Sequence, residues 1–203
     1  MKNGKKIGIL GGTFNPIHCG HLYLAESAMK AASLDEVLFI PSGVSYMKDQ
    51  REILSPVDRM EMVKLAISNY PNFNTSSIEI NKAGNSYSYE TILELKEQYH
   101  DVDFFFLTGA DTLFSIESWK KPDVIFREAA ILAAYRVGVS LEALQQQILY
   151  LQKKYAADIS LTAVTHVDIS STDIRHLVKN GASIKGLVPF EVEHYIKQHC
   201  FYK

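Results

Sequence analysis

Short apolar runs alternate with segments of helical periodicity along the whole chain. The apolar runs predict strands at Lys6–Leu10, Glu36–Ile40, Asp103–Leu107, Ala130–Ala134 and Ile159–Thr165, and Asn74–Ile80 is predicted as a more polar strand. The periodic segments predict helices at His21–Ala32, Pro56–Asn69, Tyr89–Tyr99, Leu141–Tyr155, Thr172–Lys179 and Glu191–His199. Such alternation is typical of parallel βαβ units. We therefore expect an α/β fold that is Rossmann-like and doubly wound, with helices on both faces of a mostly parallel sheet of about six strands.

Several element boundaries have recognisable local chemistry. Ser55-Pro56-Val57-Asp58 combines an N-cap serine, a first-turn proline and an acid three residues on, which predicts a helix start. Asn180-Gly181 predicts a helix end, since glycine readily adopts the left-handed C-cap conformation. Asp103–Leu107 is so apolar that we expect a central strand covered on both faces.

Composition narrows the class of protein. The 203 residues are 47% hydrophobic and 22% charged, without repeats or a linker, so we expect a single domain over residues 1–203. A net charge of −2 argues against nucleic acid as a partner, and no apolar run approaches the length of a membrane span. The first apolar run is too short for a signal peptide, and Cys19 and Cys200 make no disulfide framework. These features predict a cytoplasmic protein with no membrane partner; its oligomeric state stays open.

The stretch GGTFNPIHCGHL concentrates chemistry at the end of the first predicted strand. It has neither the G-x-G-x-x-G spacing of dinucleotide-binding loops nor a G-K-[ST] sequence. Instead, His18 and His21 flank Gly20 at the mouth of a predicted helix, where free N–H groups and the helix dipole favour an anion. Two other roles for this pair are possible. The histidines could cap a turn and fill space in the structure, or they could bind zinc. A zinc site needs three or four ligands, and no second cluster lies near His18, Cys19 and His21. Phosphate binding accounts for all these elements together.

The same stretch resembles the H-x-G-H signature of a nucleotidyltransferase superfamily. ISSTDIR (Ile169–Arg175) resembles the second signature of these enzymes, and the blocks at Ser86–Leu93, Phe104–Trp119 and Ala134–Gly138 resemble bacterial nicotinate-nucleotide adenylyltransferases. The resemblance covers about residues 6 to 199. It implies transfer of AMP from ATP to nicotinate mononucleotide, which yields nicotinate adenine dinucleotide and pyrophosphate on the route to NAD.

The resemblance implies three sets of site residues. The catalytic residues would be His18, His21, Arg175 and Lys48, with Arg51 able to share the role of Lys48. The ATP-binding residues would be Gly11, Gly12, Thr13, Phe14, His18, Gly20, His21, Gly109, Asp111, Ile169, Ser170, Ser171, Thr172 and Arg175. The mononucleotide-binding residues would be Lys48, Ser88, Trp119 and Arg136, with Trp119 against the pyridine ring. Mg²⁺ would be held mainly through the ATP phosphates, with no protein metal site.

Structural explanations compete with several of these roles. Lys48 can be a solvated loop cation, Trp119 a core anchor and Arg136 part of a surface salt bridge. The chain also departs from the family pattern, because Asn15 stands where an aspartate is common and Glu90 replaces an aspartate beside Ser88.

Three other functions remain as alternatives. They are nicotinamide mononucleotide as acceptor, another adenylyltransferase reaction of the superfamily, and a nucleotide sensor without turnover. Whether the Pro41–Leu54 loop is ordered without ligand is likewise open from sequence.

Overall fold

The computed structural model describes residues 4–43, 53–82, 84–135, 140–164 and 169–203. Its strands are β1 (Lys5–Gly12), β2 (Glu36–Pro41), β3 (Phe73–Thr75), β4 (Val102–Gly109), β5 (Ala130–Tyr135) and β6 (Ile159–Ala163). Its α-helices are α1 (Cys19–Ala32), α2 (Pro56–Ile67), α3 (Ser88–Gln98), α4 (Pro122–Glu128), α5 (Leu141–Tyr155), α6 (Ser171–Lys179) and α7 (Phe190–Gln198). Two 3₁₀ turns, η2 (Ala110–Phe114) and η3 (Ile116–Ser118), follow β4.

The strands form one six-stranded sheet in the order β3-β2-β1-β4-β5-β6. The pairs β1–β4, β4–β5 and β5–β6 are parallel, with Ile9 opposite Phe106 and Leu107 opposite Leu132. The order reverses direction at β1, as in doubly wound sheets. The predicted α/β class is confirmed, and β4 is the central strand that its apolar sequence indicated.

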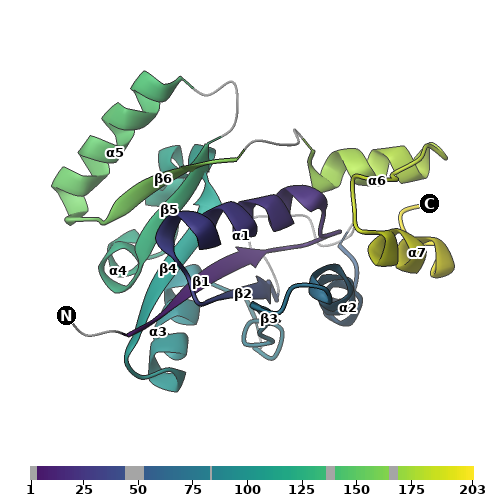
Figure 1. Ribbon diagram of the computed structural model, residues 1–203, viewed down its shortest axis with the longest axis horizontal. Helices are drawn as coiled ribbons and strands as arrows, with labels where there is room; N and C mark the ends of the chain where they lie inside the picture. The colour runs from purple at the N-terminus through teal and green to yellow at the C-terminus, as the bar shows by residue number, and fades with distance from the viewer. Residues whose placement is uncertain (1–3, 44–52, 83, 136–139, 165–168) are drawn as a thin grey trace. The chain divides into compact units, whose positions relative to one another are not determined.

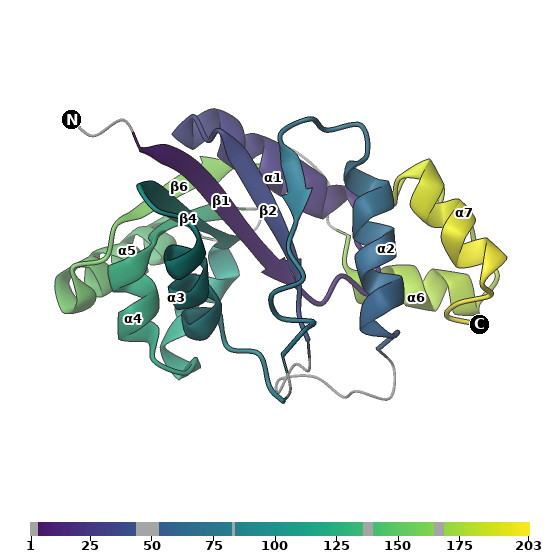
Figure 2. The same ribbon diagram turned by 90° about the horizontal axis from the view of Figure 1, so that it is seen from below.

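Contacts divide the chain into two compact units. The first comprises Met1–Leu10, Leu24–Leu38 and Tyr87–Thr165, and the second Gly11–Tyr23, Phe39–Ser86 and His166–Lys203. In the first unit, residues 24–32 of α1 lie on one face of the strands and α3 and α4 on the other (Figure 1 and Figure 2). In the second unit, α2 packs against α7 and β3. The single domain expected from composition stays a prediction.

Each unit has its own buried apolar core. The first unit buries, among others, Ile7, Val37, Leu107, Ile131 and Leu151. The second unit buries, among others, Phe14, Ile17, Phe39, Met62 and Val192. The candidate site residues are attached to the strands and helices that these two cores hold in place.

Local capping chemistry sets several boundaries as the sequence indicated. The Ser55 and Ser140 side chains accept bonds from Asp58 N (3.1 Å) and Ala143 N (3.4 Å), at the starts of α2 and α5. At the end of α6, Gly181 follows the C-cap Asn180 with a φ of +69°. At these helix ends, residues next to the helix in sequence cap backbone groups that have no partner within the helix.

The predicted strand Asn74–Ile80 is wrong over most of its length. β3 ends at Thr75, and residues 78–81 form a turn. Ser76 Oγ accepts from Ile78 N (3.4 Å) and Ser77 Oγ from Asn81 Nδ2 (3.0 Å). A serine side chain that bonds a nearby backbone N–H, as Ser76 does, competes with strand pairing.

Three short helical elements between β4 and β5 have no counterpart in the predicted pattern. They are η2, η3 and α4. The N-cap of α4 is Lys121, which adopts left-handed geometry and gives no side-chain cap, so only Pro122 at the first turn signals a start.

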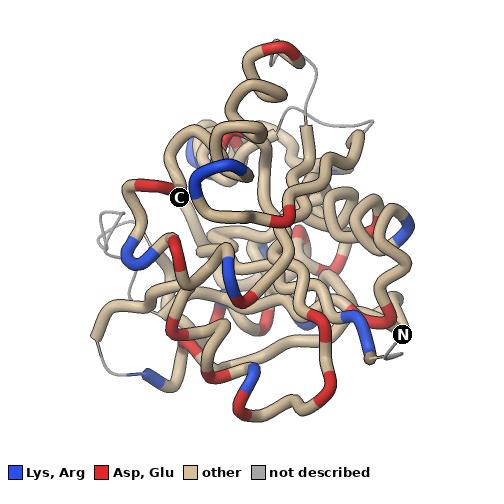
Figure 3. The backbone as a smooth tube through the Cα atoms, turned by 90° about the vertical axis from the view of Figure 1, so that its left-hand side faces the viewer, with Lys and Arg blue, Asp and Glu red and all other residues tan. Residues whose placement is uncertain are grey.

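The placement of charged residues and the hydropathy of the helices give the same picture as the amino-acid composition. Lys/Arg and Asp/Glu positions are interspersed along the chain (Figure 3). Within the ranges that the structure describes, no helix is both long and apolar enough to cross a membrane.

Candidate active site

The loop after β1 carries the first signature and leads into α1. Phe14 has a φ of 49°, and α1 begins at Cys19, directly after His18. The His21 amide donates to the His18 carbonyl at 2.9 Å, which closes the first turn. Both histidines therefore lie at the amino end of a 14-residue helix. The Cys19 amide donates to the Leu187 carbonyl at 2.9 Å. The helix dipole makes such an end favourable for an anion.

The two imidazole rings lie against each other in a fixed arrangement. Their centroids are 3.7 Å apart with an interplanar angle of 31°. The His18 amide donates to His21 Nδ1 at 3.2 Å, and the Phe14 ring meets His21 edge-on at 4.9 Å. Because Nδ1 of His21 is an acceptor, the neutral ring carries its proton on Nε2. In that tautomer Nε2–H is the ring's donor, and an imidazole N–H is a donor of the type suited to a phosphate oxygen.

The second signature begins α6 with a capping box. Ser170 Oγ accepts from Asp173 N at 3.1 Å, while the Asp173 carboxylate accepts from Ser170 N at 3.1 Å. Ser170 Oγ also donates to Asp173 Oδ2 at 2.6 Å. This reciprocal capping fixes the first turn of α6, where Ser171 and Thr172 lie.

Direct hydrogen bonds join the two signatures within the second unit. Ser171 Oγ donates to the Pro16 carbonyl at 2.9 Å. Arg175 Nη1 donates to the Asn15 carbonyl at 3.0 Å, and its Nη2 to Thr172 Oγ1 at 3.3 Å. The amino ends of two helices, two histidines and an arginine thus belong to one hydrogen-bonded assembly. Such an assembly is suited to a polyanion.

The remaining candidates that the structure describes belong to the first unit. Gly109 ends β4, and a Cβ at this position would collide with the carboxylate of Asp111 in η2. Ser88 begins α3. Trp119 lies edge-on to Phe106, with ring centroids 6.0 Å apart, and its buried Nε1 has no hydrogen-bond partner in the described part of the chain. A buried unpaired indole N–H is uncommon and leaves a donor for a ligand.

Comparison with known proteins decides the family. The family model for cytidylyltransferase-like proteins matches residues 9–177. "Probable nicotinate-nucleotide adenylyltransferase" of Lachnoclostridium phytofermentans is 40% identical over 198 residues, which cover 98% of this chain and 99% of that one. Its namesake in Clostridium botulinum (strain Alaska E43) is 42% identical over 199 residues, 98% of each chain. The chain belongs to the nicotinate-nucleotide adenylyltransferase family. The resemblance seen in the sequence is thereby confirmed.

Solved structures support the fold of this nicotinate-nucleotide adenylyltransferase family member. Plasmodium falciparum nicotinic acid mononucleotide adenylyltransferase complexed with APC superposes with a TM-score of 0.77 at 18% identity, covering 98% of this chain and 97% of that one. The same enzyme complexed with NaAD gives a TM-score of 0.75 at 19% identity. At these identities the likeness establishes the fold.

Three predicted site residues lie outside the described residues. They are Lys48 and Arg51, in the loop after β2, and Arg136, directly after β5. The other predicted candidates divide between the units. The H-x-G-H and ISSTDIR residues belong to the second unit, and Ser88, Gly109, Asp111 and Trp119 to the first.

Arg59 is a site-supporting residue that sequence reasoning missed. It lies on α2 with only 1% of its surface exposed. Its guanidinium donates to the carbonyls of Thr13 (2.7 Å), Ser42 (2.6 Å), Gly43 (3.4 Å) and Leu54 (3.1 Å). Burial lowers the pKa of this guanidinium from its ordinary value. Arg59 thus ties the first signature to the start of the loop after β2.

The donor set favours an anion over a protein-held metal ion. Within the described ranges, no group of three or more His, Cys, Asp or Glu side chains is arranged to hold a metal. Asp173, the acid in the second signature, is committed to the capping box. A divalent cation fits this set only when a ligand brings most of the oxygen atoms.

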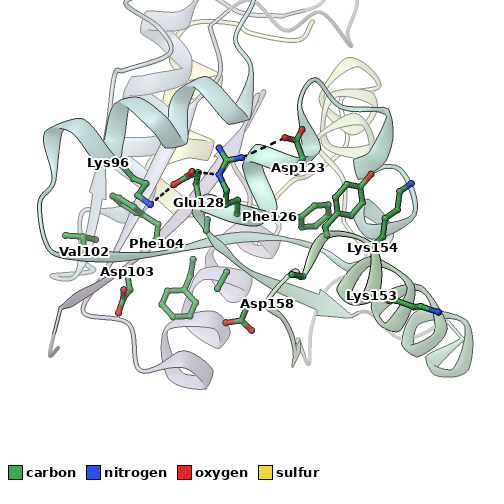
Figure 4. A pocket seen from close by; sticks show the side chains of 16 residues that line it. Lys96, Val102, Asp103, Phe104, Asp123, Phe126, Glu128, Lys153, Lys154 and Asp158 are labelled. Atoms are coloured by element: carbon green, nitrogen blue, oxygen red, sulfur yellow. Dashed lines mark hydrogen bonds and ion pairs between the residues drawn. The ribbon is translucent and has the colours of Figure 1, made fainter. Parts of the chain in front are cut away.

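A separate groove in the first unit lies at the wrong end of the sheet for this chemistry. It is lined by the starts of β4 and β5, including Val102, Asp103 and Ala130 (Figure 4). In its lining, Glu128 accepts from Lys96 at 2.6 Å and from Arg127 at 2.8 Å. Open α/β sheets bind ligands at the carboxyl ends of their strands. The groove is therefore not the candidate active site.

The capping box of α6 makes a pH-dependent contribution to stability. Hydrogen bonds from the Ser170 side chain and amide lower the pKa of Asp173 below its ordinary value. A lowered folded-state pKa stabilises the protein above the unfolded-state pKa, about 3.9 for Asp, and this stabilisation disappears as pH falls through the folded-state value. We expect Asp173→Asn to have a lower thermal midpoint than wild type at neutral pH, with the gap closing below about pH 4. Thermal unfolding across a pH series measures the gap, and a gap that is constant with pH would contradict this account.

Proposed function

We propose that this chain transfers the AMP moiety of ATP to nicotinate mononucleotide and releases pyrophosphate. A phosphate oxygen of the mononucleotide forms a bond to the α-phosphorus of ATP, and the bond from that phosphorus to the β-phosphate oxygen breaks. The product is nicotinate adenine dinucleotide. Relatives at 40% and 42% identity over nearly their full length carry the corresponding name. The observation that carries the proposal is the hydrogen-bonded joining of the two signatures by Ser171 and Arg175.

The reaction requires charge stabilisation more than proton transfer. A phosphate monoester has a second pKa near 6. The attacking oxygen is therefore already ionised at neutral pH, and no general base is needed. The chain's task is to hold a triphosphate and a monophosphate together despite their repulsion. Imidazole, guanidinium and helix-end amides are donors suited to that task.

We assign the ATP phosphates to the second unit. The catalytic donors are His18, His21 and Arg175, joined by Lys48. Backbone and side chains of the two signatures complete the phosphate site: Gly11, Gly12, Thr13, Phe14, Gly20, Ile169, Ser170, Ser171 and Thr172. Gly109 and Asp111 are assigned to adenosine, because an aspartate readily accepts hydrogen bonds from ribose hydroxyls.

We assign binding of nicotinate mononucleotide, the acceptor substrate, to residues that offer an aromatic face and polar donors. Trp119 offers a flat surface to the pyridine ring, and Ser88 a hydroxyl to the nicotinate carboxylate. Lys48 and Arg136 supply positive charge for the acceptor's phosphate and carboxylate groups. A divalent cation such as Mg²⁺ would be held mainly through the ATP phosphate oxygens and would supply positive charge against the triphosphate.

A pyrophosphate-release assay with ATP and Mg²⁺ tests this function. We expect pyrophosphate only when a mononucleotide acceptor is present, with kcat/KM for nicotinate mononucleotide at least about tenfold above that for nicotinamide mononucleotide, because a site that pairs with a carboxylate discriminates against an amide. Chelation with EDTA should abolish release, and added Mg²⁺ should restore it.

Two results would overturn the proposed function. No pyrophosphate with either acceptor would indicate a nucleotide sensor without turnover. A preference for nicotinamide mononucleotide would overturn the assignment of the acceptor.

A further inference from the structure

The last residues of the chain fold back after α7 in a constrained path. Cys200 and Tyr202 have φ values of 55° and 63°, in the left-handed region that non-glycine residues rarely occupy. Phe201 stacks on His199 with centroids 5.3 Å apart, and its amide donates to the Ile196 carbonyl at 3.1 Å. Unfavourable backbone conformations persist only where surrounding contacts maintain them. The tail is therefore anchored on the second unit.

The anchored tail ends on the first signature. Tyr202 Oη donates to Asn15 Oδ1 at 2.9 Å. The Leu54 amide donates to the same oxygen at 3.2 Å, and Arg175 binds the Asn15 carbonyl. Asn15 is only 4% exposed. Contacts from the tail, the segment before α2 and α6 thus converge on one buried residue of the phosphate-binding loop.

The hydrogen bond from Tyr202 to Asn15 joins groups that keep their donor and acceptor roles. Burial raises the pKa of Tyr202 well above its ordinary value, so the hydroxyl keeps its proton and remains a donor. The acceptor is a side-chain oxygen at the position where the family commonly has aspartate. A carboxylate there would accept the same two bonds, so the departure at Asn15 leaves this contact intact.

We propose that Tyr202 is a positioning residue for the adenylyl-transfer site, which it serves by fixing Asn15 and thereby the loop that carries His18 and His21. The inference rests on the proposed function and extends it to a residue that acts through Asn15. Ile17, between Asn15 and His18, is fully buried. A shift of Asn15 is therefore transmitted to the histidines rather than absorbed by a loose segment. Displacements of about 1 Å in such machinery reduce rates substantially.

Tyr202→Phe tests the proposal, because it removes the donor while retaining the ring. Loss of one hydrogen bond to a positioned group should lower kcat by about 3- to 10-fold, with a smaller change in KM for ATP. Tyr195→Phe is the matched control, since Tyr195 Oη donates at 3.0 Å to Asp58 on α2 instead of to Asn15. We expect Tyr195→Phe to retain the wild-type kcat.

A double-mutant cycle with Asn15→Ala separates positioning from general destabilisation. If Tyr202 acts through Asn15, the Asn15→Ala/Tyr202→Phe enzyme should have the kcat of Asn15→Ala alone. Independent effects that multiply, or a Tyr202→Phe kcat equal to that of Tyr195→Phe, would overturn the proposal.

An activity-independent measurement distinguishes this inference from the proposed function. The imidazole NMR signals of His18 and His21 should shift in Tyr202→Phe and stay in place in Tyr195→Phe. If wild type releases no pyrophosphate, the proposed function fails, and these signals still report whether Tyr202 positions the loop. Signals unchanged in Tyr202→Phe would overturn the positioning role.

Discussion

Replacing His18 or His21 with alanine should lower kcat for pyrophosphate release by about 10²- to 10³-fold, the usual effect of removing one preorganised donor to developing charge. The magnitude follows from the geometry. The two rings are 3.7 Å apart and fixed by a backbone bond to His21 Nδ1. They therefore need no reorganisation as negative charge moves between phosphates. Loss of His21 also removes the acceptor of the His18 amide, so this variant should be at least as severe.

Rate constants and thermal midpoints must be measured together for these variants. The control is His100→Ala, because His100 is exposed and belongs to the first unit, away from both signatures in sequence. This control should leave both quantities unchanged. A His18 or His21 variant with a kcat within about threefold of wild type and an unchanged midpoint would remove the histidines from the catalytic assignment.

Most of the fold was predictable because it depends on local pattern. The strands from β4 to β6 are short apolar runs, and the starts of α2 and α5 rest on capping serines that any reader of the sequence can identify. The failures share a cause. Ser76 and Ser77 make local hydrogen bonds in a turn where a strand was predicted, and α4 begins without a side-chain cap. In both places the structure forms an element without the sequence signal that normally predicts it.

The candidate site was predictable where a motif names its residues. Ser171 and Arg175 reach the loop of the first signature, which is the structural consequence of two motifs about 150 residues apart. The supporting residues were not predictable. Arg59 on α2 and Tyr202 near the terminus belong to ordinary amphipathic or terminal sequence. Arg59 binds backbone carbonyls and Tyr202 binds the side-chain oxygen of Asn15, and these partners come close only when the chain folds.

Arg59 should therefore have the largest effect on stability among the residues described. We expect Arg59→Met to lower the free energy of unfolding by about 3–5 kcal/mol, because it leaves buried carbonyls unpaired at about 1–3 kcal/mol each. Methionine retains much of the side-chain volume, so the loss reports hydrogen bonding more than a cavity. Urea denaturation measures the difference. Arg127→Met is the matched control, since the Arg127 side chain is 60% exposed and its ion pairs lie on the surface. It should change stability by less than about 1 kcal/mol.

Arg59→Lys refines the same experiment and covers the case in which Arg59→Met does not fold. A lysine ammonium cannot reproduce the planar fork that reaches the Thr13, Ser42 and Leu54 carbonyls together. We expect Arg59→Lys to fold with an intermediate loss of stability and a lowered kcat, because Thr13 belongs to the loop of the first signature, to which we assign phosphate binding. Retention of wild-type stability in Arg59→Lys would show that charge alone suffices. A loss in Arg59→Met no larger than in Arg127→Met would show that the four carbonyl contacts contribute little. The argument for Arg59 thus depends on geometry, and the two substitutions separate geometry from charge.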